Sequence, residues 1–567
     1  MPLPAENSTW PPRHWQPAFN RYLLDEALWL NDQTTLSAIT SGGDKDTVAS
    51  GISVGALHRR GLLGIDRTRR WAWGAPRAAG EARTNMPVPI AAALADLSAA
   101  QLMAEAPRVR SIGPDGKTVK GNTQTRLDLI ANSDDAHMTL IEGATMTAAL
   151  GAVVMKANWD TTDPDRESVW FDVLGADCAI PTFNSAGRLL EVVLFTTYPD
   201  PAPGGLLLRH VERHAPGVIE HALYRGRPES IGRLVPLDTL GELAPIMSTP
   251  GIRLEGLIAV VPTGLTRLTA AWWRNRPTRL WRREGALSNA GRSDFELVEP
   301  LLDAYQEAWS SLMRDVRLGK ARLLVPLGML EVSTINGRGS TFDTDREIYA
   351  EVGGLNPESG TDTIKDFQAA IRYREHLTTL AAIKTEILDA VGWSLASYGQ
   401  PTGLDGSGGA VTATEVVDRT TKSERTRDEK ALYYKQPAAS FFRMLAELDG
   451  RAYPGKGGGP IDALAIDFPD VSQVDPEKQA RTFLDLSTAH AISIEQTVRE
   501  RRPNWDDDEV LAEVDRIMAD IDRLEGGMTD PTALGRIDLT DPAETITPPD
   551  LPDEPPAVDE PPADPTA

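Results

Sequence analysis

The stretch that decides the fold begins with SDFELVEPLLDAYQEAWSSLMRDVRL, residues 293–318. Ser293 and Glu296 predict a capping box, in which each side chain satisfies a free backbone N–H at a helix start. Apolar residues then recur at three- and four-residue spacing from Leu297 to Val316, the pattern of one amphipathic helix. Acids lie early and bases late in the segment, as the helix dipole favours. We therefore predict a helix over 294–318.

Two further helices are predicted downstream. One covers 363–391, and the other opens on the string TATEV at 412–416 and is bent by Pro437, whose ring breaks the hydrogen-bond ladder. A glycine-rich loop at 398–411 lies between them. At about 1.5 Å per residue, the first two helices are roughly 35–45 Å long, which suits a stem better than a compact enzyme core. Taken alone, the third helix fits the solvated helix of any large helical protein equally well.

This order of elements resembles the portal proteins of tailed bacteriophages, head-to-tail connectors whose fold is divided into wing, stem, clip and crown. In that family two stem helices flank the clip, a tunnel loop follows the second, and a long kinked wing helix comes next. Four short strings in the family's order strengthen the resemblance: Met86-Pro87-Val88-Pro89, Asn275-Arg276-Pro277, Gly291-Arg292-Ser293-Asp294 and Thr412-Ala413-Thr414-Glu415. The resemblance covers most of residues 85–525.

The resemblance implies an α+β fold, mainly helical, with a β-rich wing, a two-helix stem, a small α/β clip, a helical crown and a disordered acidic C-terminal tail. The implied segments are an N-terminal arm and outer segment (1–85), the wing of helices and antiparallel strands (86–293), the first stem helix (294–318), the clip (319–362), the second stem helix (363–392), the tunnel loop (398–411), the kinked wing helix and linker (412–460), the crown (461–525) and the tail (526–567).

The residues themselves support two parts of this division. Short β-rich runs separated by Pro and Gly turns in 151–271 predict an antiparallel meander. Residues 526–567 are rich in Pro, Asp and Glu, with Arg536 as the only base. Such a segment cannot bury enough apolar surface to fold, so we predict a disordered tail.

Composition narrows the class of protein. The chain has 567 residues, 41% hydrophobic and 25% charged, which is ordinary for a globular protein of several modules. Cys178 is the only cysteine, which excludes a disulfide framework and a thiolate metal cluster. The net charge of −24 argues against a protein that grips DNA phosphates, although it suits a channel through which a duplex slides.

We expect no contact with a membrane. No apolar run approaches the ~20 residues that span a bilayer. The N-terminal string MPLP lacks a basic region followed by an apolar core, so we expect no signal peptide. The sequence therefore predicts a protein that is made in a reducing cytoplasm.

The glycine-rich loop is the candidate DNA-contacting segment. It contains five glycines, so its backbone is permissive. No GxxxxGK[ST] string occurs in the chain, so we expect neither phosphate cradling nor nucleotide hydrolysis. The resemblance implies that the tunnel is lined by Gly403, Leu404, Asp405, Gly406, Ser407 and Gly408.

A second candidate is the run WWRNRPTRLWRR at 272–283, in which Trp and Arg interleave. Such a run can bind single-stranded nucleic acid through stacking and phosphate contacts. It also suits a protein interface, where both residue types are enriched. Its place just before the first stem helix favours the subunit interface, for which the candidates are Trp272, Trp273, Arg274, Arg276, Arg279 and Trp281.

His210, Glu212 and His214 alternate along a predicted strand, with His221 in the next one. Alternate side chains share one face of a strand, so a zinc site is one interpretation. The string is not His-Glu-x-x-His, however, and a polar sheet face is the favoured interpretation. No Ser/His/Asp constellation and no acid–base carboxylate pair is recognisable. We therefore expect no catalytic residue, no metal and no cofactor.

These observations together predict a non-enzymatic phage portal protein. The resemblance implies a homododecameric ring at one capsid vertex, assembled in the host cytoplasm, through which DNA passes during packaging and ejection. The implied partners are the large terminase subunit, the major capsid protein and scaffold, the head–tail adaptor, and double-stranded DNA bound without sequence specificity. The alternative is another virion structural protein, such as a minor head protein or adaptor. A hydrolase fused to a structural region has little support, because no catalytic motif is present.

Overall fold

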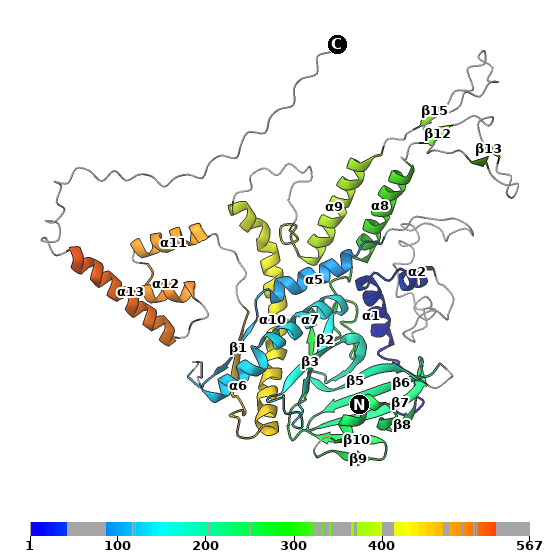
Figure 1. The fold of residues 1–567 in the computed structure, drawn as a ribbon, viewed down its shortest axis with the longest axis horizontal. Coiled ribbons are helices and arrows are strands. Elements are labelled where there is room, and N and C mark those ends of the chain that lie inside the picture. Colours follow the sequence, from blue (N-terminus) through cyan, green and yellow to red (C-terminus); the bar gives the residue numbers. More distant parts are fainter. Residues whose placement is uncertain are drawn as a thin grey trace, which may run out of the picture. The chain divides into compact units, whose positions relative to one another are not determined.

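The computed structural model divides the chain into two compact units, Met1–Val474 and Asp475–Ala567 (Figure 1). It describes residues 2–41, 87–115, 118–119, 121–201, 205–248, 251–318, 322–324, 331–332, 340–341, 365–367, 371–399, 413–468, 476–489, 491–502, 505 and 507–528. Helices and sheets are mixed within the first unit, as expected for an α+β fold.

The largest sheet of the first unit is antiparallel. Its strands follow the order β4-β5-β6-β7-β10-β9, and β8 also pairs with β7. These strands are β4 (Ala179–Phe183), β5 (Leu189–Pro199), β6 (Leu207–Ala215), β7 (Val218–Arg227), β8 (Ser230–Val235), β9 (Arg253–Glu255) and β10 (Ile258–Pro262). Because β4 to β7 pair successively and antiparallel, the predicted meander is confirmed. The short 3-10 helices η1 (Ala176–Cys178), η2 (Leu237–Thr239) and η3 (Gly241–Ser248) adjoin this sheet in sequence.

A second sheet has the order β11-β2-β3. Its strands are β2 (Ala152–Asn158), β3 (Trp170–Gly175) and β11 (Ala270–Arg274), and the helices nearby in Figure 1 are α5 (Ile90–Met103), α6 (Asn122–Ala131) and α7 (Asp134–Leu150). A separate pair joins β1 (Arg108–Ile112) to β16 (Ala463–Asp467), antiparallel. The predicted crown began at residue 461, but this pairing places 463–467 in the first unit.

Figure 1 shows α8 (Glu299–Leu318) and α9 (Tyr373–Val391) side by side. They are antiparallel, and Asp315 near the end of α8 accepts hydrogen bonds from Arg372 (3.0 Å) and His376 (3.0 Å) at the start of α9. The chain between them includes β12 (Arg322–Leu324) paired with β15 (Lys365–Phe367), and β13 (Glu331–Val332) paired with β14 (Ser340–Thr341).

Both helices begin later than predicted. Pro300 accounts for the late start of α8, because a proline fits the first turn of a helix but, in a helix interior, clashes with the preceding turn. The predicted capping box is therefore wrong: Ser293 Oγ accepts from the Phe295 N–H (3.0 Å) ahead of the helix. The second helix cannot include 365–367, since these residues form β15.

Helix α10 (Ala413–Ala452) contains Pro437, as the sequence predicted. Its second half packs on the β11-β2-β3 sheet through aromatic side chains. Phe441 and Phe442 each make edge-on contacts with Phe171 of β3, at ring-centroid distances of 5.8 and 5.6 Å. Tyr434 makes a similar contact with Trp273 of β11 (5.7 Å).

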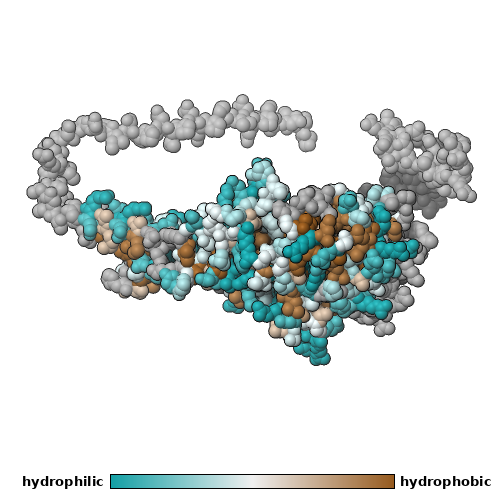
Figure 2. All heavy atoms as spheres, turned by 90° about the horizontal axis from the view of Figure 1, so that it is seen from below, coloured by the Kyte–Doolittle hydropathy of each residue, from teal (hydrophilic) through white to brown (hydrophobic). Residues whose placement is uncertain are grey.

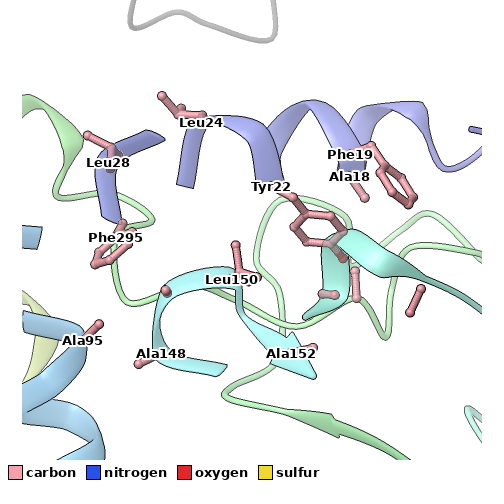
Figure 3. Packing of buried hydrophobic residues seen from close by; sticks show 14 of the residues in the cluster. Ala18, Phe19, Tyr22, Leu24, Leu28, Ala95, Ala148, Leu150, Ala152 and Phe295 are labelled. Atoms are coloured by element: carbon pink, nitrogen blue, oxygen red, sulfur yellow. The ribbon is translucent and has the colours of Figure 1, made fainter. Parts of the chain in front are cut away.

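At the N-terminus, α1 (Gln16–Trp29) and α2 (Gln33–Ser41) follow an arm that hydrogen-bonds to β8. Figure 3 shows α1, with Tyr22 and Leu28, beside the segment that carries Leu150 and Ala152 and beside Phe295. These residues belong to one large buried cluster. The N-terminal helix is thus part of the core beside the start of α8.

The second unit consists of α11 (Pro476–Thr488), α12 (Ile494–Arg501) and α13 (Asp507–Met528). Of the predicted tail (526–567), residues 526–528 form the end of α13, and the rest lies outside the described residues. Among the helices that are described, none is both long and apolar enough to cross a membrane. Hydrophilic and hydrophobic residues are interspersed on the face that Figure 2 shows.

Two glycines bring the end of α7 against the segment that leads into α8. Gly151 (φ +86°) ends α7, and Gly291 (φ +91°) passes so close that a Cβ on it would lie 2.2 Å from the Gly151 carbonyl oxygen. A Cβ on Gly151 would in turn lie 2.8 Å from the Arg292 carbonyl carbon. Left-handed backbone at these positions favours glycine, and the contact leaves no room for a side chain.

Replacing Gly291 by Ala should therefore destabilise the subunit. We expect a loss of about 1–3 kcal/mol in the free energy of unfolding, because both the left-handed φ and the backbone clash oppose the methyl group. Gly285→Ala is the control, since a Cβ there has no atom within 4 Å. Urea denaturation measures both variants, and equal stabilities for the two would contradict the close contact.

Candidate functional site

An ion pair buried at the base of α8 and α9 is the centre of the site. Lys430 Nζ, from the middle of α10, donates to Asp294 Oδ2 at 2.5 Å. Each of these side chains is 2% exposed. A buried charge is costly unless it is paired and hydrogen-bonded, so the surroundings of this pair must supply further partners.

Three other segments supply those partners. Ser98 of α5 donates its hydroxyl to Asp294 Oδ2 (2.6 Å), and the Asn275 side-chain amide donates to Oδ1 (2.8 Å). Trp393, just past α9, donates its indole N–H to Ser98 Oγ (2.9 Å), and Lys430 Nζ lies 5.3 Å from the centroid of this indole. Burial alone would raise the pKa of Asp294, but Lys430 and these hydrogen bonds outweigh it and lower the pKa. The carboxylate is thus held in its charged form.

We call the side chains of Asp294, Lys430, Ser98, Asn275 and Trp393 the junction. Arg276 extends it. Its guanidinium donates to the Val391 carbonyl at the end of α9 (3.2 Å) and pairs with Glu429 of α10 (3.3 Å). Asn275 also donates to the Arg292 carbonyl (3.0 Å). Two of the strings that resemble the portal family, 275–277 and 291–294, therefore meet at one place in the fold.

The structure buries the tryptophans of the run at 272–283. Trp272, Trp273 and Trp281 are 8%, 1% and 5% exposed. Trp272 donates its indole N–H to the Asn289 carbonyl (2.9 Å), and Trp273 packs against α10. No stacking platform for single-stranded nucleic acid is available from these three side chains, which excludes that interpretation of the run.

The same burial changes how the predicted interface residues can act. Arg276 is buried in the junction, and Arg274 is half-buried with a hydrogen bond to Asn289 Oδ1 (3.1 Å). Of the six residues predicted for the interface, Arg279 is the one whose side chain is exposed. The interface role of the run stays a prediction, but within the subunit its tryptophans are core residues.

The residues predicted to line the tunnel, 403–408, lie outside the described residues. The chain is described up to Gly399, after α9, and again from Ala413, where α10 starts. Tyr398 is fixed at the near end by Lys384 of α9, whose Nζ lies 4.0 Å from the ring centroid. The loop thus joins the junction end of α9 to the start of α10.

The histidines on β6 and β7 form a buried hydrogen-bonded group. His210 Nε2 and His221 Nδ1 are 3.2 Å apart, and burial lowers the pKa of His221 to about 4. His214 bonds to Glu212 (2.9 Å), which also pairs with Lys156 of β2 (3.1 Å). Among the described residues no three His, Cys, Asp or Glu side chains are placed to hold a metal ion. This group joins the two sheets rather than forming a solvent-facing polar surface.

The ion pair at the centre of the junction has only a partial signal in the sequence. Asp294 lies in a string that resembles the portal family, which was a signal for one partner. Lys430 had no comparable signal, because it lies on a helix rich in charges and 136 residues away from Asp294. Its importance follows from tertiary structure alone.

Comparison with known proteins agrees with the sequence prediction. The family described as phage portal protein, SPP1 Gp6-like, matches residues 266–526. Over these residues the chain is similar to the phage portal protein family. The matched portion contains β11, α8, α9, α10 and, of the five junction side chains, all except Ser98.

The other comparisons add little to the family match. A chain in the solved "virion of native gene transfer agent (GTA) particle" is 12% identical, with 77% of this chain and 97% of that chain covered and a TM-score of 0.35. At that score the similarity carries no argument about fold or function. No curated protein matches the chain.

Lys430→Met should be strongly destabilising, because it leaves the Asp294 carboxylate buried without its cation. Breaking a buried pair in this way typically costs about 3–5 kcal/mol in the free energy of unfolding. Lys422→Met is the control, since Lys422 is 49% exposed in its pair with Asp389 and such exposed pairs contribute about 1 kcal/mol or less.

Urea denaturation measures both losses. The double variant Lys430→Met with Asp294→Leu should recover part of the stability, because it removes the unpaired charge. A small and equal effect for the two single lysine variants would show that the buried pair does not hold the junction together.

Proposed function

We propose that the chain is the portal protein of a tailed phage, a non-enzymatic dodecameric ring at one vertex of the capsid. The observation that carries the proposal is the family match over 266–526, which covers the antiparallel helices α8 and α9, the proline-containing helix α10 and most of the junction. In this proposal α8 and α9 are the stem, the strand pairs between them belong to the clip, and α10 is the kinked wing helix.

The rigid junction would hold the loop 400–412 in the channel. The loop follows α9, whose last residue Val391 accepts a hydrogen bond from Arg276, and it precedes α10, which carries Lys430. A loop in the channel must follow a moving duplex without gripping it, and the five glycines of 398–411 together with the net charge of −24 suit that role. DNA would pass through this channel during packaging and ejection.

The proposed partners follow from this role. The energy for DNA movement would come from the large terminase subunit, because the chain has no nucleotide-binding string. The clip would contact the terminase during packaging and the head–tail adaptor afterwards, and the wing would contact the major capsid protein and scaffold. The protein would assemble in the host cytoplasm and remain in the virion. A minor head protein or an adaptor is the alternative, and the family match favours the portal.

Deleting Asp405–Gly409 tests the proposed channel. Rings and procapsids should still form, because the deletion leaves α9, α10 and the junction untouched. DNA packaging or retention should fail, and electron microscopy should show empty or underfilled heads. A five-residue deletion in the tail, 559–563, is the control and should leave the heads full. Normal packaging by the loop deletion would show that 398–411 is not the tunnel loop.

A further inference from the structure

Leu297 has a backbone conformation that leucine rarely adopts. Its φ is +79°, and its side chain is 59% exposed. The other described non-glycine residues with positive φ are Asn7 and Asn31, and asparagine tolerates this region far better than leucine does. A strained residue of this kind costs about 1–3 kcal/mol and persists where the surrounding structure enforces it, often at functional positions.

The flanking residues explain why the strain persists. Phe295 and Val298 are buried at 0% and 1% exposure, and the Val298 N–H donates to the Phe295 carbonyl (3.1 Å). Both side chains belong to the large cluster that also contains α1. With both anchors fixed in the core, the chain between them turns outward and presents Leu297 to solvent just before α8.

An exposed basic segment follows Asn275, whose side chain bonds to Arg292 and Asp294 shortly before this leucine. Arg279, Arg282 and Arg283 are exposed, and Leu280 between them is 52% exposed. Asn275 donates to the Arg292 carbonyl (3.0 Å) and to Asp294 Oδ1 (2.8 Å), which brings the start of this segment against the residues that precede Leu297. We call Arg279, Leu280, Arg282, Arg283 and Leu297 the Leu297 patch.

We propose that the Leu297 patch is a docking surface for a second copy of this chain. Leu297 and Leu280 would be the apolar contacts, and the three arginines would pair with acids of the neighbouring copy. The inference rests on the proposed ring and deepens it. It also places the contact between subunits on solvent-exposed residues, in place of the buried tryptophans.

Charge and chemistry favour a second copy over DNA as the occupant. Each copy has 82 acids against 58 bases, so acidic surface is abundant on the neighbour. Exposed leucines flanked by arginines have the composition of a protein interface, with an apolar centre and a charged rim. Single-stranded nucleic acid binds through exposed aromatics, and the tryptophans of this segment are buried. A duplex binds through many phosphate contacts, whereas exposed leucines have no role in such contacts.

Leu297→Asn tests the proposal, because asparagine tolerates the left-handed backbone while it removes the apolar side chain. Assembly should weaken, with the dissociation concentration in sedimentation velocity rising by about tenfold or more. The thermal unfolding temperature of the dissociated subunit should stay the same or rise, since the strain is relieved. The control is Leu254→Asn on β9, where the leucine is 57% exposed and assembly should not change.

A second variant, Arg282→Glu with Arg283→Glu, should also weaken assembly. Binding of both variants to a duplex oligonucleotide is measured by fluorescence anisotropy. Unchanged assembly for Leu297→Asn, or a defect in DNA binding in place of assembly, overturns the docking proposal.

Rings that persist in Leu297→Asn overturn only this inference. Self-association that depends on Leu297 but never closes into rings overturns the proposed function instead, and a wild-type chain that stays monomeric overturns both.

Discussion

The buried pair of Asp294 and Lys430 is the interaction on which the rest of the first unit depends. It is completed by Ser98, Asn275 and Trp393, so five segments that are distant in sequence must be in place before every polar group has a partner. In a low-dielectric interior an incomplete network costs more than an apolar core would. The network therefore selects one arrangement of α5, α8, α9 and α10 and fixes the base of the two long helices.

Backbone contacts beside this pair reinforce the same arrangement. Gly151 and Gly291 touch without room for a side chain, and the Asp294 N–H donates to the Ala148 carbonyl (2.8 Å) at the end of α7. The chain then has to reach Val298 in the core within a few residues, which forces Leu297 into its strained conformation. The exposed leucine is thus a consequence of the junction, and the proposed docking surface uses a position that the core itself determines.

Much of the architecture could be predicted from the sequence, because it depends on local patterns. Apolar spacing predicted the long helices, alternating runs predicted the meander, and short strings in order pointed to the portal family. The helices start later than their apolar spacing predicts because Pro300 belongs in a first turn and because β15 forms only through its pairing with β12. Interleaved Trp and Arg do not reveal which side chains are covered by the rest of the fold. Trp272 and Trp273 are both buried because each face of β11 packs on a different buried cluster. The pairing of Lys430 with Asp294 could not be predicted from either local segment.

Electron microscopy of the purified full-length protein tests the central claim most directly. A portal built on this junction should assemble into rings with a central hole and twelvefold symmetry, and class averages would show α8 and α9 arranged around that hole. Compact particles without a hole, or open filaments in which the contact does not close, would contradict the account.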